Sequence, residues 1–142
     1  MTVPIDYTQA SAQFGDFMLD LREALGMQTT HQAWGALLGV FDTFRRRLRP
    51  EDALAFAKAL PPLLRAVFVQ DWNFQPEVPG FGSREELDAE VMRYHGDHQF
   101  AGPGCIAATA GTLWRHVDVA RLGAALAKMP AGARAFWSVQ EH

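Results

Sequence analysis

The C-terminal end of this chain repeats a segment from its middle. The segment around Arg65 begins Leu-Pro and continues with apolar residues, and a segment of the same pattern, beginning Met-Pro, surrounds Arg134. The numbering offset between the two arginines is 69, and the same offset matches apolar positions farther upstream. Over the first predicted helix of each copy the offset becomes 70. A repeat at a fixed offset indicates that one structural unit occurs twice, so it constrains the architecture more than any single residue does.

The apolar residues of each copy recur with the period of an α-helix. In the first helix Phe14, Phe17, Leu21 and Leu25 fall on one face. Neither sustained alternation nor an Asn-Gly or Asp-Gly hairpin signal indicates a β-strand. We therefore predict helices over about residues 8–25, 29–48, 50–59 and 62–68 in the first copy, and 83–95, 103–117, 119–128 and 130–137 in the second.

The predicted fold class is all-α, with two tandem repeats of about four helices each packed around a shared core. Each half alone is too small to bury a hydrophobic core that would stabilise it, so one domain is expected. The assignments are residues 1–142 for the single domain, 8–71 for repeat one, 72–82 for the inter-repeat linker and 83–139 for repeat two. The linker is rich in proline and glycine, yet Trp72, Phe74 and Phe81 make it too apolar for a free tether. We expect it to pack across the seam between the repeats.

Polar and glycine residues mark the predicted helix ends. Thr29 with Gln32, and Ser83 with Glu86, have the spacing of a capping box, in which each side chain accepts a hydrogen bond from the other residue's backbone. Gly26 follows the first helix and fits a left-handed stop.

The composition indicates a globular protein and excludes several other classes. Of 142 residues, 49% are hydrophobic and 20% charged, and the formal net charge of −3 argues against a general polyanion-binding protein. Cys105 is the single cysteine, so no intramolecular disulfide can form. We see no signal-peptide pattern and no apolar run of the roughly 18 residues that a membrane span requires. A cytoplasmic protein that does not enter the membrane is therefore expected.

Four elements of the sequence form a recognisable combination. They are the Phe14-Gly15-Asp16-Phe17 helix ending at Gly26, the helix running into Phe44-Arg45-Arg46-Arg47-Leu48, the Leu60-Pro61 helix reaching Trp72, and a second copy from Ser83 to Trp137. Together they resemble a bacterial family known as domain of unknown function 2267. The resemblance implies a small helical protein, and it supplies no catalytic or binding residues. The sequence departs from a clean second copy at Gly102-Pro103-Gly104-Cys105.

One candidate site is a pair of histidines. His95 and His98 flank Asp97, and zinc takes three or four nitrogen, sulfur or oxygen ligands. His31 or His116 could approach them through the fold. The other interpretation is a solvated turn, because a glycine between the two histidines ends a helix and cations suit a helix C-terminus. No cofactor is assigned, and a metal-dependent enzyme using these three residues is kept as an alternative.

A second candidate site is the densest cluster of positive charge, formed by Arg45, Arg46, Arg47 and Arg49. Such a cluster could bind a phosphate of nucleic acid or another anion. It could equally be a helix end whose arginines pair with the acids that follow at residues 51 and 52. The net negative charge of the chain argues against nucleic acid.

The sequence favours a non-enzymatic binding or oligomerisation module. No P-loop, dinucleotide-binding or Gly-x-Ser-x-Gly pattern occurs, and Cys105 lacks a recognisable histidine partner. Aromatic residues on amphipathic helices are abundant, which suits a protein partner or self-association. The repeated positions describe a fold, so we expect function to lie in the positions that differ between the copies or in the linker.

Overall fold

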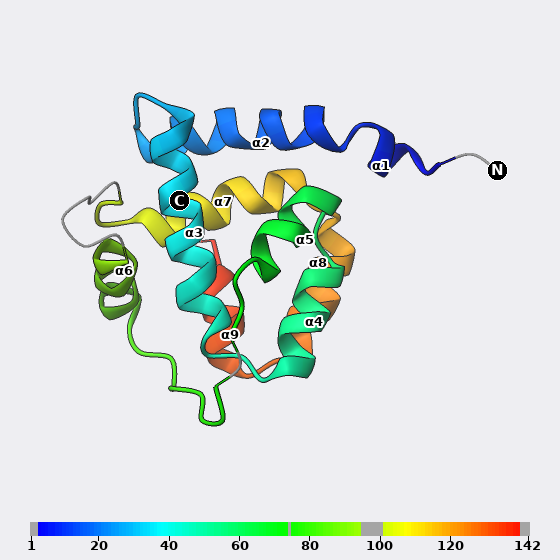
Figure 1. Ribbon diagram of the computed structural model, residues 1–142. Coiled ribbons are helices and arrows are strands. Elements are labelled where there is room, and N and C mark those ends of the chain that lie inside the picture. The colour runs from blue at the N-terminus through cyan, green and yellow to red at the C-terminus, as the bar shows by residue number, and fades with distance from the viewer. Residues whose placement is uncertain (1–2, 74, 95–100, 140–142) are drawn as a thin grey trace.

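The computed structural model describes residues 3–73, 75–94 and 101–139 (Figure 1). Within them every regular element is a helix, which confirms the predicted all-α class. The helices are α1 (Ile5–Thr8), α2 (Ala10–Leu25), α3 (Thr30–Arg45), α4 (Pro50–Lys58), α5 (Pro62–Val69), α6 (Arg84–Arg93), α7 (Cys105–His116), α8 (Val119–Ala127) and α9 (Ala131–Trp137). Of the helices in this part of the chain, none has the length and apolarity that crossing a bilayer demands.

The predicted helix ends are confirmed where capping residues marked them. Thr29 and Gln32 form a capping box at α3, and Ser83 and Glu86 form another at α6. Each cap gives free backbone N–H groups an acceptor and stabilises its helix by about 1 kcal/mol. Gly26 ends α2 with a φ of 68°, a left-handed conformation that glycine adopts without strain.

The first predicted helix is interrupted near its start. Gln9 has φ −108° and ψ 10°, outside the helical range, and it separates α1 from α2. Thr8 turns its hydroxyl back to the carbonyl oxygen of Ile5, a local hydrogen bond with which threonine ends a helix. The chain before residue 10 therefore forms its own short turn of helix instead of a simple first turn of α2.

The helix predicted from Pro103 begins two residues later, at Cys105. Gly104 has a φ of 82°, so the backbone turns through a left-handed residue before the helix starts. The cap comes from another helix, because the Asp88 carboxylate on α6 accepts hydrogen bonds from the backbone N–H groups of Gly104 and Ile106. The sequence gave no indication that Asp88 would cap α7, because it lies 16 residues before Gly104.

Helices from the two halves of the chain interleave. Helix α2, from the first half, packs most extensively against α7 in the second half, and α6 from the second half packs against α3 in the first. Helices α4 and α8 also contact each other (Figure 1). The two halves are therefore packed into each other.

The core is a cluster of aromatic rings that both halves supply. Phe44 and Phe56 lie with ring centroids 4.8 Å apart, and Phe136 and Trp137 approach Phe44 at 4.9 and 5.3 Å. Such pairs contribute about 0.5–1.5 kcal/mol each beyond the burial of their area. The buried apolar residues of the described chain form one contiguous cluster.

The segment before α6 packs on this core. The Phe81 ring lies 6.1 Å from Phe44 and 6.3 Å from Phe136, measured between centroids. Arg47 Nε donates a 3.1 Å hydrogen bond to the carbonyl oxygen of Gly80. These residues therefore pack against α3 and α9, and the expectation that the segment crosses a seam between two repeats stays a prediction.

Candidate functional site

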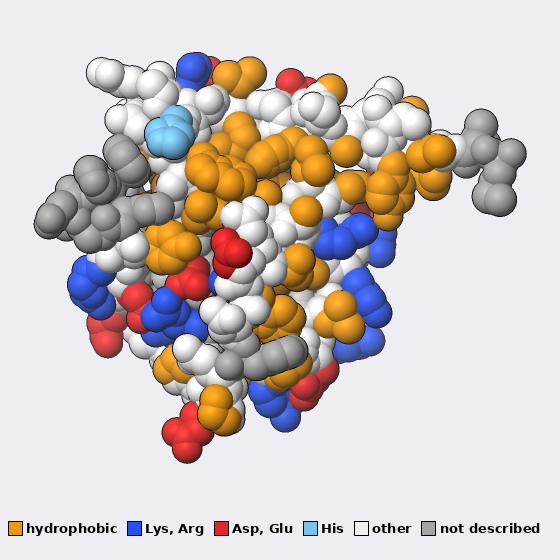
Figure 2. Space-filling view, viewed as in Figure 1, with side chains coloured by type: hydrophobic (Ala, Val, Ile, Leu, Met, Phe, Trp, Pro, Cys, Tyr) orange, Lys and Arg blue, Asp and Glu red, His pale blue; other side chains and the backbone are white. Residues whose placement is uncertain are grey.

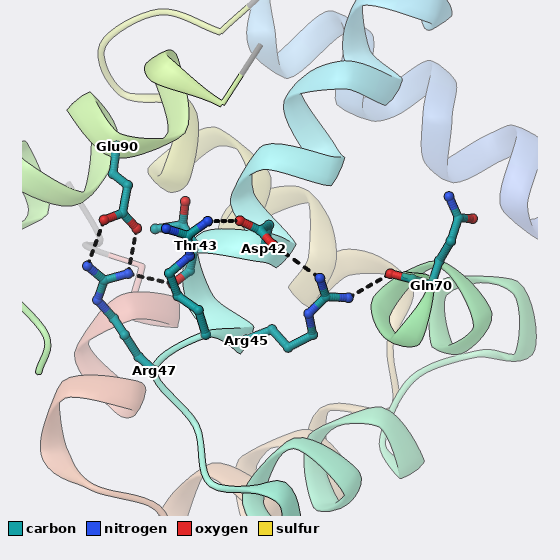
Figure 3. Close-up of polar contacts among 7 residues, drawn as sticks. Asp42, Thr43, Arg45, Arg47, Gln70 and Glu90 are labelled. Carbon is teal, nitrogen blue, oxygen red and sulfur yellow. Dashed lines mark hydrogen bonds and ion pairs between the residues drawn. The ribbon is translucent and has the colours of Figure 1, made fainter. Parts of the chain in front are cut away.

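The arginine cluster at the end of α3 is largely engaged within the protein (Figure 3). Arg45 is buried, and its Nη1 donates hydrogen bonds of 2.9 and 2.8 Å to the carbonyl oxygens of Phe68 and Gln70. Its Nη2 also pairs with Asp42 at 3.1 Å. Because the carbonyls belong to the C-terminal end of α5, Arg45 satisfies acceptors that this helix leaves free.

Arg47 makes a two-pronged ion pair with Glu90 on α6, with N–O distances of 2.5 and 2.9 Å (Figure 3). The hydrogen bonds from Arg47 hold the pKa of Glu90 below its usual value. A further hydrogen bond runs from Arg47 Nη1 to the carbonyl oxygen of Thr43. This side chain therefore ties α6 to the end of α3.

The other two arginines are more exposed. Arg46 pairs with Asp42, with 39% of its side chain accessible. Arg49 is 68% exposed and lies 3.5 Å from Glu51, so the pairing with the following acids is present. Any anion taken up here would meet mainly these two residues, and anion binding by the cluster stays a prediction.

His95, Asp97 and His98 lie outside the described residues, so the hypothesis of a metal site there also stays a prediction. Within the part of the chain that the structure describes, no group of three or more His, Cys, Asp or Glu side chains is arranged to hold a metal ion.

Cys105 is buried at the start of α7 and is a poor nucleophile. Burial and then the Asp88 carboxylate, which lies 3.4 Å from its Sγ, raise the pKa of the thiol to about 12. Reactive cysteines need the thiolate, and this thiol stays protonated at neutral pH.

The described chain has a groove of about 460 Å³ on its surface. Three elements form it: the N-terminal half of α2, the turn between α4 and α5, and the turn between α7 and α8. We call it the α2 groove. Its apolar surface comes from Ala10, Phe14, Phe17, Ala59, Leu60, Pro61, Pro62, Leu63 and Leu64. Its polar rim comes from Asp6, Gln13, Asp16, Arg65, His116, Asp118 and Arg121.

Two arginines on the rim of the α2 groove contact uncharged acceptors. Arg65 donates hydrogen bonds to the carbonyl oxygens of Ala57 and Leu60 and to the Tyr7 hydroxyl, and Arg121 donates to the carbonyl oxygen of Lys58. Within the described residues neither guanidinium is paired with a carboxylate. Each guanidinium has five N–H donors, so both retain capacity for an acidic ligand group.

His116 stands on the same rim. Its Nε2 lies 2.5 Å from a carboxylate oxygen of Asp20, and the ring of Phe17 meets it edge-on at a centroid distance of 5.5 Å. The pair joins the end of α7 to α2 and thereby fixes one wall of the groove.

The chain also matches the model of a known protein family. The model of a family described as an uncharacterized conserved protein, DUF2267, matches residues 14–136. The chain belongs to this family. The resemblance noted in the sequence is thus confirmed, and a search of curated proteins finds no match to the chain.

The DUF2267 match covers most of the α2 groove. It begins at Phe14 and therefore includes both turns and most of the α2 wall, whereas α1 and the first turn of α2 precede it. The edge of the groove that Asp6 and Ala10 provide thus lies outside the segment matched to the DUF2267 family.

The α2 groove is not among the sites predicted from the sequence. Its walls come from three segments that are far apart in the chain, and no short motif joins them. The sequence nevertheless contains one signal for it, a difference between the two copies. At the offset of 69, His116 corresponds to Arg47 and Gly132 corresponds to Leu63. His116 and Leu63, at which the two copies differ, both line the groove.

Proposed function

We propose that this protein is a non-enzymatic binding module, and that the α2 groove takes a non-helical peptide segment bearing an aromatic side chain. The observation that carries the proposal comes from the second half of the chain. There, Phe81 fills the position that corresponds to the α2 groove of the first half.

We infer that the chain consists of two tandem repeats, related by an offset of 69 over most of their length. Three pairs of contacts support this. In the first pair, Arg45 donates to the carbonyl oxygen of Phe68 at 2.9 Å, and Trp114 Nε1 donates to the carbonyl oxygen of Trp137 at 2.7 Å. Donor and acceptor are both displaced by the repeat offset. The side chains differ chemically, yet both deliver an N–H to the same carbonyl of the corresponding helix.

The second pair of contacts involves the two matched arginines. Arg65 donates to the carbonyl oxygen of Leu60, and Arg134 donates to the carbonyl oxygen of Met129. Each arginine thus reaches back five residues to the turn that precedes its own helix. A shared structural role explains why arginine stands at both positions.

A third pair of contacts crosses between the halves. Arg47 binds Glu90, and His116 binds Asp20. Arg47 and His116 are related by the offset of 69, and Asp20 and Glu90 by the offset of 70 found for the first helix of each copy. This correspondence supports an arrangement in which the first long helix of each repeat packs on the second helix of the other.

The same correspondence relates the α2 groove to a filled site. In that filled site, the non-helical segment before α6 places the Phe81 ring against Gly132. The contact is so close that a Cβ on that glycine would lie 2.5 Å from a ring atom. Arg47 holds the segment by its bond to the Gly80 carbonyl oxygen. In the other half Leu63 replaces the glycine, and with 38% of its area exposed it presents an apolar contact to solvent.

The α2 groove stays open because the residues before Phe14 run away from it, whereas the residues before Arg84 fold back onto the corresponding site. Helix α6 begins at Arg84, which corresponds to Phe14, but α2 begins four residues earlier, at Ala10. The residues that would correspond to the Phe81 segment are therefore helical and continue away from the core (Figure 1). An incoming segment would find an apolar floor for its ring and the arginine donors of the rim for its carbonyl or carboxylate oxygens.

A peptide copied from the linker tests the proposal. We expect Val-Pro-Gly-Phe-Gly-Ser, the sequence of residues 78–83, to shift the backbone amide NMR signals of Leu60, Leu63, Leu64 and Arg65 saturably. The same peptide with alanine in place of phenylalanine should bind about tenfold or more weakly, because burying an aromatic side chain contributes about 1.5–3 kcal/mol.

Two leucine variants provide the matched control. Leu63→Trp should fill the groove and abolish the shifts, whereas Leu54→Trp, at a position 52% exposed and outside the groove lining, should leave them unchanged. Equal binding of the two peptides, or full binding by Leu63→Trp, would contradict the proposal.

We also place this module in the cytoplasm. The single cysteine, buried and with a raised pKa, and the absence of any possible intramolecular disulfide support a reducing compartment.

A further inference from the structure

The segment that precedes α2 carries three exposed apolar side chains. Val3, Ile5 and Tyr7 are 62%, 65% and 55% exposed, and they stand within five consecutive residues. We call Val3–Thr8 the arm. Figure 1 shows it extending from the body of the protein in line with α2, and Figure 2 shows hydrophobic side chains along it with Lys and Arg side chains just beneath. Isolated exposed apolar residues are ordinary, but a projecting group of them marks a contact surface.

Resting on the proposed function, we propose that the arm of a second copy of this chain occupies the α2 groove, so that two copies exchange arms across a two-fold axis. The observation behind it is a likeness between the arm and the segment that fills the corresponding site. The arm reads Val3-Pro4-Ile5-Asp6-Tyr7, and the filling segment reads Val78-Pro79-Gly80-Phe81. Both follow Val-Pro with an aromatic residue within three positions.

The geometry of the arm directs it to a partner rather than to its own groove. To bring Tyr7 to the place that corresponds to Phe81, the first turn of α2 would have to unwind, because α2 extends four residues beyond the start of α6. In a two-fold pair the turn can stay intact. The arm borders its own groove, since Asp6 lines it and Arg65 Nη1 lies 3.3 Å from the Tyr7 hydroxyl. A patch that contains both the arm and its receptor is self-complementary, as an isologous dimer requires.

The arm can form an ion pair with the groove rim. The arm carries the carboxylate of Asp6. The rim carries the carboxylates of Asp16 and Asp118, but also the guanidinium groups of Arg65 and Arg121, which within the described residues have no carboxylate partner. A carboxylate that enters with the partner's arm would accept from one of them. Arg121 is the better placed because, among the described residues, its guanidinium makes a single hydrogen bond, to the Lys58 carbonyl oxygen.

The adaptability of the arm also suits docking. Helix α1 has only four residues and no side-chain hydrogen bond at its N-cap. An isolated helix of that length has little stability of its own, so it can adjust its backbone to the groove at small cost. The exchange forms two equal arm–groove contacts in each dimer, which doubles the area that one arm buries.

Sedimentation velocity of the full chain over a concentration series tests the exchange. We expect a dimer for the wild type, and at least tenfold weaker dimerisation for Ile5→Asp and for Leu63→Trp. Leu54→Asp, at an apolar position off the groove that is 52% exposed, between Leu63 at 38% and Ile5 at 65%, should dimerise as the wild type does. Circular dichroism and thermal melting confirm that each variant is folded. A wild type that stays monomeric at 100 µM, or a dimer indifferent to Ile5→Asp, would overturn the inference.

A charge exchange and a directed cross-link make the test specific. Asp6→Arg and Arg121→Asp should each weaken the dimer about fivefold or more, and the double variant should restore it. Mixing a Tyr7→Cys variant with a Leu63→Cys variant should give a heterodimeric disulfide on mild oxidation, with little background because Cys105 is buried. Failure of restoration together with absence of the heterodimer would count against the arm as the occupant.

These outcomes separate the inference from the proposed function. If the wild type is monomeric but binds the linker peptide, the groove is a peptide site and the arm exchange is wrong. If the peptide does not bind and the dimer survives Leu63→Trp, both are wrong.

Discussion

Asp88 should stabilise the fold more than any other carboxylate near α7. It is 9% exposed, and its two oxygens accept from the backbone N–H groups of Gly104 at 3.0 Å and Ile106 at 3.1 Å. Replacement by alanine leaves the buried N–H of Ile106 without an acceptor, at about 1–3 kcal/mol. It also removes the acceptor of the more exposed Gly104 N–H and takes a negative charge from the positive end of α7. We expect Asp88→Ala to lower the free energy of unfolding by about 2–4 kcal/mol.

Equilibrium denaturation in urea measures this change, and two variants calibrate it. Asp88→Asn keeps an acceptor oxygen and should lose about half as much as Asp88→Ala. Asp16→Ala, at an exposed position on α2, should stay within about 0.5 kcal/mol of the wild type. A free energy of unfolding for Asp88→Ala that equals that of the Asp16→Ala control would refute the reasoning.

The same substitution has a chemical readout at Cys105. Burial remains in Asp88→Ala, but the charge and hydrogen bond of Asp88 no longer raise the pKa of the thiol, so it should fall below about 12. In the wild type the folded-state pKa exceeds the unfolded value, so this contribution to stability is complete below about pH 9 and is lost as the pH rises toward 12. Cys105→Ala should remove that part of the alkaline dependence, and native alkylation rates against pH report the thiol directly.

Two further predictions concern the contacts between the halves. The Arg47 hydrogen bonds lower the pKa of Glu90, so their stabilisation is present above the ordinary value of 4.5 and is lost as the pH falls through the folded-state value. Glu90→Gln should therefore cost about 1–2 kcal/mol at pH 7 and progressively less as the pH is lowered below 4.5. A cost that stays constant in urea titrations over a descending pH series would contradict this. Gly132→Ala should cost about 1–3 kcal/mol because its methyl group would meet the Phe81 ring, whereas Gly15→Ala, with nothing within 4 Å, should stabilise by about 0.5–1 kcal/mol. Thermal melting of the pair checks the sign, and a stabilised Gly132→Ala would rule the contact out.

The helices were predictable because their signals are local. Apolar periodicity and the caps at Thr29, Ser83 and Asp118 depend on residues within four positions of one another, so the sequence contains them directly. The break at Gln9 was missed since no proline or glycine marks it. Local hydrogen bonding by Thr8, which the sequence pattern does not distinguish from a helical threonine, accompanies that break.

The partners of the arginines could not be predicted, because they depend on tertiary packing. Arg47 meets an acid 43 residues away, and Arg45 meets a carbonyl 23 residues away. The neighbouring acids at 51 and 52, which the sequence suggested as partners, suit Arg49 alone. The α2 groove was hidden for the same reason: its walls become neighbours only after α2 has crossed to α7.

That crossing also sets the order in which a newly made chain can fold. The surface of α2 that packs on α7 must wait for Cys105–His116, and the surface of α3 that packs on α6 must wait for Arg84–Arg93. During synthesis the first half therefore leaves the ribosome with its largest apolar faces uncovered until most of the chain has followed. Contacts this distant in sequence slow folding and expose nascent chains to aggregation. A ribosome-bound chain truncated before residue 105 should accordingly be protease-sensitive throughout α2, and protection should appear for the whole protein at once.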